Sequence, residues 1–219
     1  MSMLSCLEIE PLQAANSSVI WLHGLGANGH DFEPIVQELA IPKSMAIRFI
    51  LPHSNEIPVT VNGGVVMPAW YDILEIGASR KINEADLVAS VAEIHKLIRR
   101  EQERGIASER ILIAGFSQGG AIAYHAALSY PEKLAGILGL STYYPKPAII
   151  ERQRVNEQIP IQIYHGTHDS MVLESLGKEA YQALSDFGYP VQYKNYPMDH
   201  EVCQTEIADI SLFIQKNLI

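Results

Sequence analysis

A glycine-rich turn joins an apolar run to a helix-forming stretch near the middle of this 219-residue chain. Residues 111–114 are Ile-Leu-Ile-Ala, and they lead directly into Gly-Phe-Ser-Gln-Gly at 115–119. A G-x-S-x-G pattern between a strand and a helix is typical of a strained turn that lifts the serine side chain out of the backbone. Small residues let the chain turn that tightly, and the N-terminal end of the following helix favours negative charge. We therefore interpret Ser117 as a nucleophile, rather than as part of a chance match in a glycine-rich turn.

Two residues with complementary chemistry follow later predicted strands. Asp169 comes shortly after residues 161–165, which read as a strand, and His200 comes after the alternating residues 191–196. A serine hydroxyl attacks efficiently only when a base takes its proton, and an acid must orient that base. The ends of parallel strands meet at one edge of an open α/β sheet. The order serine, acid, histidine therefore predicts that Ser117, Asp169 and His200 form a catalytic triad.

Neighbouring residues compete for two of these roles. His168 adjoins Asp169 and is the nearer competitor for a polar role there, whereas His165 ends its predicted strand as a packed or capping residue. Asp199 adjoins His200, but neighbouring side chains in an extended segment point apart. Asp199 is therefore a poor candidate for the acid that orients His200.

A tetrahedral oxyanion needs N–H donors, and the sequence offers two backbone amides for that purpose. One is the amide of Gln118, directly after the predicted nucleophile. The other lies in the loop His-Gly-Leu-Gly at 23–26, which follows the apolar residues 19–22. Glycines let a backbone amide approach a substrate closely, so we expect Leu25 to supply the second donor.

The same loop contains a competing motif. Residues 24–29 read G-x-G-x-x-G, after a strand and before a candidate helix at 31–40, as in dinucleotide-binding folds. That fingerprint also needs an acid at the end of the second strand, but residues 49–54 contain none, and the first carboxylate is Glu56. A nucleotide-binding oxidoreductase is therefore the less favoured alternative.

Composition excludes several other classes of protein. The length suits a single α/β domain over 1–219, and no apolar run is long enough to cross a membrane. Residues 1–12 contain no basic residue, so they are not a secretory signal, and we expect no stable membrane anchor. A net charge of −9 argues against nucleic acid as a partner. Two cysteines, Cys6 and Cys203, are too few for a disulfide framework and suit a reducing cytoplasm.

Metal or cofactor chemistry has no support in the sequence. His200-Glu201 begins like a zinc-binding helix motif, but the fourth residue after His200 is Gln204. The other histidines are scattered without ligand spacing. We expect no metal and no organic cofactor.

Apolar periodicity predicts strands that alternate with helices along the whole chain. The predicted strands are 19–23, 46–51, 110–114, 134–140, 161–165 and 191–196, with a weaker edge strand at 7–10. The predicted helices run from 86 to about 104, then over 117–128, 173–187 and 205–217, with the candidate at 31–40. Such alternation gives a mostly parallel sheet with helices on both faces.

Two long segments interrupt this alternation. Residues 55–80 contain two short apolar stretches around Gly63-Gly64, which predict a hairpin, and residues 141–160 form the second excursion. Long ordered loops are often functional, and apolar loops above a nucleophile suit an acyl chain. We expect Trp70 to line the substrate pocket, with packing in the core as an equally open alternative.

Together these motifs resemble the acyl-protein thioesterase and bacterial carboxylesterase/phospholipase family. The matching motifs are His-Gly-Leu-Gly at 23–26, Pro-Ala-Trp-Tyr-Asp at 68–72, Gly-Phe-Ser-Gln-Gly-Gly at 115–120, His-Gly-Thr-His-Asp at 165–169, and His200. The resemblance implies a compact α/β-hydrolase fold without a large cap domain. It also implies hydrolysis of carboxylic esters or thioesters, with Ser117, Asp169 and His200 as triad and the Leu25 and Gln118 amides as oxyanion hole.

The chain departs from the family pattern at two places. Members usually carry a second Asp and a Pro around the triad acid, where this chain has Thr167 or His168 and Ser170. Members also usually place Ser or Thr after the catalytic histidine, where Glu201 stands here. No catalytic group is lost, but substrate preference stays open.

The sequence therefore predicts a cytoplasmic serine esterase that works through an acyl-enzyme. Its expected substrates are small-molecule or lipid esters with short-to-medium acyl chains, such as a lysophospholipid, or an acylated protein. Apolar loops are compatible with a homodimer. A catalytically silent binding protein of the same fold is the alternative, which the complete triad order disfavours.

Overall fold

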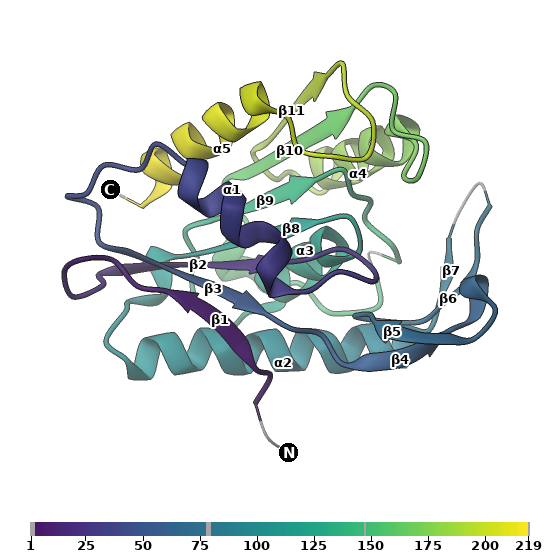
Figure 1. Ribbon diagram of the computed structural model, residues 1–219, viewed down its shortest axis with the longest axis horizontal. Coiled ribbons are helices and arrows are strands. Elements are labelled where there is room, and N and C mark those ends of the chain that lie inside the picture. The colour runs from purple at the N-terminus through teal and green to yellow at the C-terminus, as the bar shows by residue number, and fades with distance from the viewer. Residues whose placement is uncertain (1–2, 78–79, 147, 219) are drawn as a thin grey trace.

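A seven-stranded sheet forms the centre of the computed structural model, which describes residues 3–77, 80–146 and 148–218 (Figure 1). Its strand order is β1-β3-β2-β8-β9-β10-β11, and every neighbouring pair is parallel except the antiparallel pair β1–β3 at one edge. The strands are β1 (Cys6–Ile9), β2 (Ser17–Leu22), β3 (Ile47–Pro52), β8 (Ile111–Phe116), β9 (Gly136–Leu140), β10 (Ile161–Gly166) and β11 (Val191–Tyr196). The predicted mostly parallel sheet and its edge strand are confirmed.

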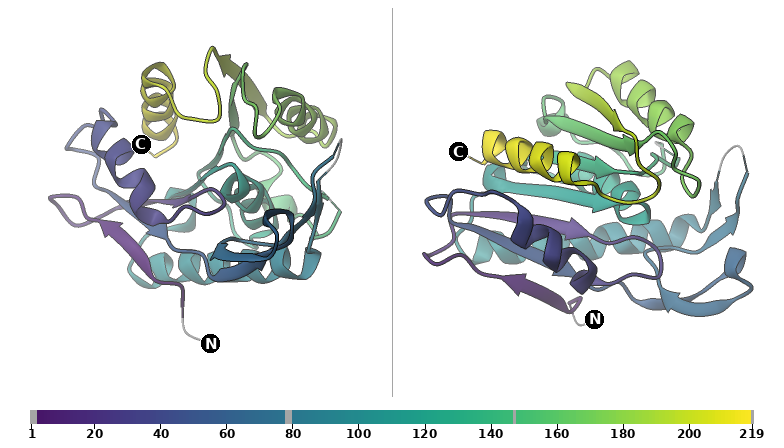
Figure 2. Two further views of the ribbon diagram at one scale, coloured as in Figure 1. Left: turned by 45° about the vertical axis from the view of Figure 1, so that its right-hand side comes forward. Right: turned by 45° about the horizontal axis from the view of Figure 1, so that its top comes forward.

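Helices cover both faces of this sheet (Figure 2). One apolar cluster joins the sheet to α2 (Glu84–Glu103), α3 (Gln118–Ser129) and α4 (Glu174–Asp186). A second cluster joins the opposite face to α1 (Glu33–Glu38) and α5 (Gln204–Asn217). Because both faces are covered, almost every residue of the inner strands is buried, and buried positions do not alternate with exposed ones.

Helix α2 begins two residues before its predicted start. The Asn83 side chain accepts hydrogen bonds from the amides of Ala85 and Asp86, which is how a good N-cap residue satisfies a helix start. The apolar residues Leu87, Val91, Ile94, Leu97 and Ile98 of α2 are buried, whereas Val88 is 43% exposed. A surface helix presents only about a third of its circumference to a core, and Val88 lies outside that stripe.

The candidate helix at 31–40 is much shorter than expected. A 3-10 turn (Gly29–Phe32) precedes α1, and Asn28 caps that turn in a reciprocal pair with Asp31. Leu39 then adopts an extended conformation and ends the helix after six residues. Local capping and the chain's return to the sheet therefore override its weak helical periodicity.

The first excursion consists of two hairpins beyond the ends of the parallel strands (Figure 1). The predicted hairpin is confirmed as β4 (Glu56–Val59) and β5 (Val65–Pro68), joined by a 3-10 turn (Thr60–Asn62) and two glycines. Both glycines have positive φ, 69° at Gly63 and 79° at Gly64, which a side chain would disfavour. The second pair, β6 (Ile73–Glu75) and β7 (Lys81–Ile82), is too short to leave a periodic signal in the sequence.

The second excursion, 141–160, is anchored by a buried amide side chain; residue 147 lies outside the described residues. Asn156, at the end of a 3-10 turn (Arg154–Asn156), donates to the carbonyl oxygens of Tyr130 and Glu132. Its own oxygen accepts the amide of Leu134. Three hydrogen bonds hold this loop against the start of β9 without a regular helix or strand.

No helix of the described chain is long and apolar enough to cross a membrane.

The first turn of α5 contains a fully buried carboxyl group, and this gives a prediction for stability. Burial, with a smaller contribution from the charge of Asp209, raises the pKa of Glu206 from 4.5 to about 8. The folded protein therefore holds a proton that the unfolded chain releases above about pH 4.5. Stability should fall as pH rises between these two pKa values and then level off.

The variant Glu206→Gln should remove this pH dependence, because glutamine carries no titrating proton. We expect its free energy of unfolding to match wild type near pH 4 and to exceed it by on the order of 3–5 kcal/mol above pH 8. Urea unfolding across this range measures the difference. Glu179→Gln, on the exposed side of α4, is the matched control and should follow wild type throughout. A constant gap between Glu206→Gln and wild type at all pH values would contradict the assignment.

Candidate active site

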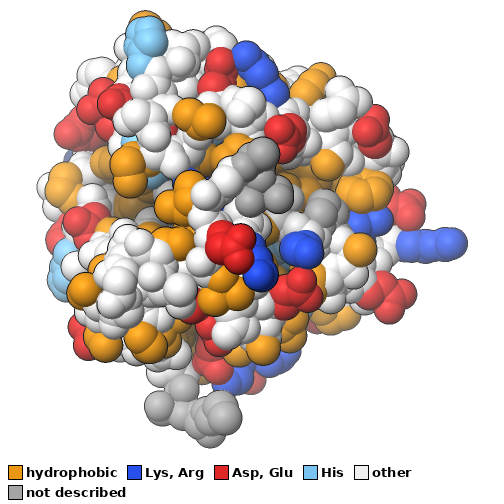
Figure 3. All heavy atoms as spheres, turned by 90° about the vertical axis from the view of Figure 1, so that its right-hand side faces the viewer, with side chains coloured by type: hydrophobic (Ala, Val, Ile, Leu, Met, Phe, Trp, Pro, Cys, Tyr) orange, Lys and Arg blue, Asp and Glu red, His pale blue; other side chains and the backbone are white. Residues whose placement is uncertain are grey.

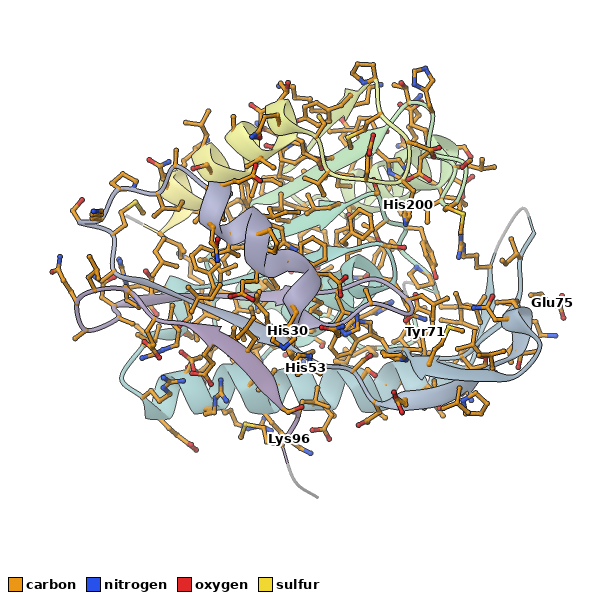
Figure 4. The ribbon with its side chains drawn as sticks, in the orientation of Figure 1. His30, His53, Tyr71, Glu75, Lys96 and His200 are labelled. Carbon is orange, nitrogen blue, oxygen red and sulfur yellow. The ribbon has the colours of Figure 1, made fainter. Side chains whose placement is uncertain are left out.

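The residues predicted to carry the chemistry all follow parallel strands at the same edge of the sheet. Ser117 comes directly after β8, Asp169 after β10 and His200 after β11, while Leu25 lies in the loop after β2. Figure 4 shows His200 at this edge, in the loop that leaves β11. The topology therefore brings groups from four separate segments to one end of the molecule.

Ser117 sits in the strained turn that the sequence predicted. Its backbone has φ 53° and ψ −121°, a conformation that residues with a side chain rarely adopt. A Cβ atom at Gly115 would lie 2.4 Å from the carbonyl carbon of Gly119, and one at Gly119 would lie 2.4 Å from the His23 carbonyl oxygen. The amide of Ser117 donates to the Leu140 carbonyl at 2.9 Å, which ties the turn to β9. Close backbone contacts on both sides explain why the pattern needs glycines.

Asp169 and His200 form a direct hydrogen bond. The Nδ1 atom of His200 lies 2.7 Å from Oδ2 of Asp169. The other carboxylate oxygen accepts the amides of Met171 and Val172 at 3.0 and 2.7 Å. Burial acts to raise the pKa of Asp169, but the hydrogen bonds from His200 and Val172 outweigh it and lower that pKa below its ordinary value. Asp169 is therefore ionised and fixed in orientation.

Asp199 binds the backbone of the loop that contains His200 and does not bind the imidazole ring of His200. Its Oδ1 atom accepts the backbone amide of His200 at 2.8 Å and both the amide and the hydroxyl of Ser170 at 2.9 and 3.0 Å. Proline in place of Ser170 would have no amide hydrogen to donate to Asp199. The amide and the hydroxyl of Ser170 therefore link the loop of Asp169 to the loop of His200.

The two other histidines near Asp169 differ sharply in environment. His168 is exposed, and its backbone amide donates to the Met198 carbonyl. His165 is fully buried; its Nε2 lies 2.8 Å from the Val172 carbonyl and 3.5 Å from Asp169 Oδ2. Burial lowers the pKa of His165, so the ring is neutral and donates from Nε2. His165 is a packed residue, as expected, and it braces the turn that presents Asp169.

The glycine loop after β2 packs directly against Ser117. A Cβ atom at Gly24 would lie 3.3 Å from the Ser117 Cβ. The buried ring of His23 fixes the loop, because Nε2 accepts the Ser54 amide at 3.1 Å and Nδ1 donates to the Gly24 carbonyl at 2.7 Å. Burial lowers the pKa of His23 and keeps this ring neutral.

The amides of Leu25 and Gln118 are both available to a ligand. Within the described ranges, neither amide donates a hydrogen bond to another group of the chain. Both residues line the same cavity as Ser117 and His200. Free backbone donors on the wall of a cavity that contains a serine are what an oxyanion requires.

The G-x-G-x-x-G reading finds no support in this geometry. Its first glycine packs on Ser117, and the turn that follows is capped by the Asp31 carboxylate, which accepts the Asn28 amide at 2.7 Å. A carboxylate at that position would repel a pyrophosphate.

Among the residues that the structure describes, no group of three His, Cys, Asp or Glu side chains could hold a metal ion.

The structure contradicts the expected role of Trp70 in substrate binding. Its side chain is only 2% exposed and does not line the cavity. The indole donates to the His23 carbonyl at 2.9 Å, and its ring packs on the His23 ring at a centroid distance of 5.1 Å. Core packing, the alternative that the sequence left open, therefore applies. Trp70 supports the glycine loop from behind.

The side chain of Gln118 connects this loop region to the first excursion. Its Oε1 atom accepts the Trp70 amide at 2.8 Å, and its Nε2 donates to the Tyr71 carbonyl at 2.7 Å. Both groups are buried. Gln118 therefore has a structural side chain as well as a free amide, and the sequence motif predicted only the amide.

A cavity of about 610 Å³ opens at Ser117. Figure 3 views this end of the molecule and shows apolar side chains gathered around a hollow. Most of the wall is apolar, and the excursions supply part of it, as expected. The larger apolar lining residues are Leu25, Phe32, Ile35, Val61, Met67, Ile73, Ile76, Phe116, Tyr143, Met171, Val172 and Val202.

Sequence reasoning missed two charged residues of this wall, Asp31 and Arg80. Asp31 belongs to a capping pair and Arg80 directly precedes the short strand β7, so neither lies in a motif with a chemical meaning. Only the folded chain brings them to the cavity.

Comparisons with known proteins show the family and the fold of this chain. A model of the phospholipase/carboxylesterase family matches residues 5–218. The chain is similar to acyl-protein thioesterase 1 of Neurospora crassa, with 37% identity over 213 residues that cover 92% of this chain and 87% of the relative. It is also similar to the crystal structure of Arabidopsis thaliana SOBER1, with 32% identity, a TM-score of 0.88, and coverage of 94% of this chain and 100% of that one. Zea mays acyl-protein thioesterase 2 gives 26% identity and a TM-score of 0.87 over 98% and 99% of the two chains. The fold is that of the α/β hydrolases.

Proposed function

The chain belongs to the phospholipase/carboxylesterase family of serine hydrolases, and on that basis we propose that Ser117, Asp169 and His200 are its catalytic triad. The amides of Leu25 and Gln118 form the oxyanion hole. The observation that carries this proposal is the 2.7 Å hydrogen bond between His200 Nδ1 and an ionised Asp169. It leaves Nε2 of His200 as the free basic atom of the ring.

The reaction proceeds through an acyl-enzyme. Nε2 of His200 takes the proton of the Ser117 hydroxyl as the oxygen attacks the acyl carbonyl. The carbonyl oxygen gains negative charge, which the two free amides stabilise. The protonated His200 then gives its proton to the departing alcohol or thiol. A water molecule repeats the attack on the acyl-enzyme, with His200 again as base and then acid, and releases the carboxylic acid.

The substrates are carboxylic esters and acyl thioesters, and the acyl group occupies the apolar cavity. Several relatives are named acyl-protein thioesterase 1, which supports an S-acylated protein as one substrate. The largely aliphatic wall equally suits small-molecule and lipid esters of short-to-medium acyl chains. Two unpaired cysteines, Cys6 and Cys203, support a reducing, cytoplasmic setting.

Covalent labelling combined with an ester panel tests this function. A fluorophosphonate probe should label the protein at Ser117, and 4-nitrophenyl esters from acetate to palmitate should be hydrolysed with a maximum above acetate. Each buried methylene contributes about 0.8 kcal/mol at most, which is roughly fourfold in kcat/KM per carbon until the cavity is filled. Absence of both labelling and hydrolysis would favour the silent binding protein instead.

A further inference from the structure

The active-site cavity contains a cation that the proposed mechanism does not use. Arg80 lines this cavity and also the adjoining hollow of about 270 Å³, with Tyr143 between the two. Its guanidinium carbon lies 5.0 Å from the centre of the Tyr143 ring, and one terminal nitrogen donates to the Met171 carbonyl. Arg80 therefore bridges from the second hairpin to the loop that follows Asp169.

No carboxylate of the described chain forms an ion pair with Arg80. Glu75, on the paired strand, points away from the cavity (Figure 4) and binds Lys81 at 2.9 Å. Asp31 also lines the cavity, but its carboxylate accepts the Asn28 amide. Glu179 borders the adjoining hollow without a salt bridge to Arg80. Over the described ranges, the Arg80 guanidinium therefore has no carboxylate partner.

The guanidinium also retains unused hydrogen-bonding capacity. Its Nε atom is buried from solvent and has no acceptor within the described residues. Buried donors nearly always have partners, and an unpaired one next to an active site calls for an explanation. A guanidinium presents its donors as a fork that matches the two oxygens of a carboxylate or phosphate. An aliphatic wall around it strengthens such a contact, because little water competes.

We infer that Arg80 is a subsite for an anionic group of the substrate. The preferred substrates then carry a carboxylate or phosphate in addition to the ester that Ser117 attacks. This group belongs either to the far end of the acyl chain or to the departing alcohol. The inference rests on the proposed function, because it assigns a second recognition point to the same cavity.

Matched pairs of esters separate the two sources of negative charge. In the acyl arm, 4-nitrophenyl hydrogen adipate is compared with its neutral methyl ester, which has the same chain. In the alcohol arm, 1-acylglycerol 3-phosphate is compared with the 1-acylglycerol that has the same acyl group. We expect wild type to prefer the anionic member in one arm, and that arm identifies the source.

The variants Arg80→Gln and Arg80→Lys test the residue itself. Arg80→Gln should lower kcat/KM for the preferred anionic ester by about 10- to 100-fold and leave its neutral partner within about threefold. Arg80→Lys should recover part of the loss, because it keeps the charge without the fork. Lys146→Gln removes the same charge from the rim of the adjoining hollow, where Lys146 is 56% exposed and pairs with Glu84, and should follow wild type.

The outcomes distinguish this inference from the proposed function. Hydrolysis of the neutral esters by wild type supports the esterase whether or not the anion matters. Equal loss on both members of a pair in Arg80→Gln would overturn the inference and show that Arg80 only braces Met171 and Tyr143. Absence of any preference for an anionic member in either arm of the wild-type comparison would overturn it as well.

Discussion

The variant Ser117→Ala should lose ester hydrolysis almost completely while it keeps its fold. Removing a triad member typically lowers kcat by on the order of 10⁴ or more. The hydroxyl of Ser117 makes no hydrogen bond within the described residues, and the amide that donates to Leu140 is unchanged. Alanine also has a Cβ atom, so the strain at φ 53° is the same. Hydrolysis of a 4-nitrophenyl ester and the thermal unfolding midpoint are the two measurements.

Background activity is the main source of error in this experiment. Wild type and Ser117→Ala must be purified in parallel, and both must be treated with the fluorophosphonate probe. A purified variant that keeps more than a few per cent of wild-type kcat and remains unlabelled would contradict the role of Ser117. A variant that loses both activity and its thermal transition would show instead that the elbow needs the hydroxyl for folding.

The variant Asp169→Asn should be nearly as damaging as Ser117→Ala, through the tautomer of His200. One oxygen of Asp169 accepts the amides of Met171 and Val172, so the asparagine oxygen must take that place. The new NH₂ group then faces the Nδ1–H group of His200, and two hydrogen-bond donors oppose each other. The ring relieves this conflict by carrying its proton on Nε2, which can no longer accept the proton of Ser117. We expect kcat to fall by about 10⁴ with little change in KM.

A neighbouring acid provides the control for this variant. Asp199→Asn makes the same chemical change on an exposed side chain, and its remaining oxygen can still accept the amides of Ser170 and His200. We expect its kcat to stay within about tenfold of wild type. If Asp199→Asn is the more damaging of the two, Asp169 is not the acid of the triad.

Local patterns in the sequence predicted the framework well because the sheet is buried on both faces. The strand at 191–196 has the predicted limits, since its alternating side chains end at a proline. The prediction of a helix over 31–40 was too long, because a capping pair and a tight return to the sheet outweigh the weak apolar periodicity. The second hairpin was not predicted because two strands of three and two residues have no period to detect.

The sequence predicted the site residues that directly follow parallel strands, because the strand order fixes where those residues lie. It did not predict the positions of side chains in the long loops. The positions of Ser117, Asp169 and His200 follow from strand ends, and the hydrogen bond between the last two agrees with that order. Their catalytic roles stay a prediction. The prediction that Trp70 lines the pocket was wrong. An apolar residue in a loop can face a cavity or the core, and a loop has no sequence periodicity that distinguishes the two; Trp70 is buried in the core. Arg80 was missed because only tertiary contacts bring it to the cavity.

The side chain of Gln118 sets a condition for protein engineering. Exchanging the excursion at 55–80 with that of a relative is an obvious way to change acyl preference. Two buried hydrogen bonds join that excursion at Trp70 and Tyr71 to Gln118, whose amide we propose as an oxyanion donor. A grafted loop that does not form these two hydrogen bonds would shift the Gln118 amide, and small displacements of such donors lower the reaction rate. Successful chimaeras should therefore keep residues 70 and 71 in place and cross over on either side of them.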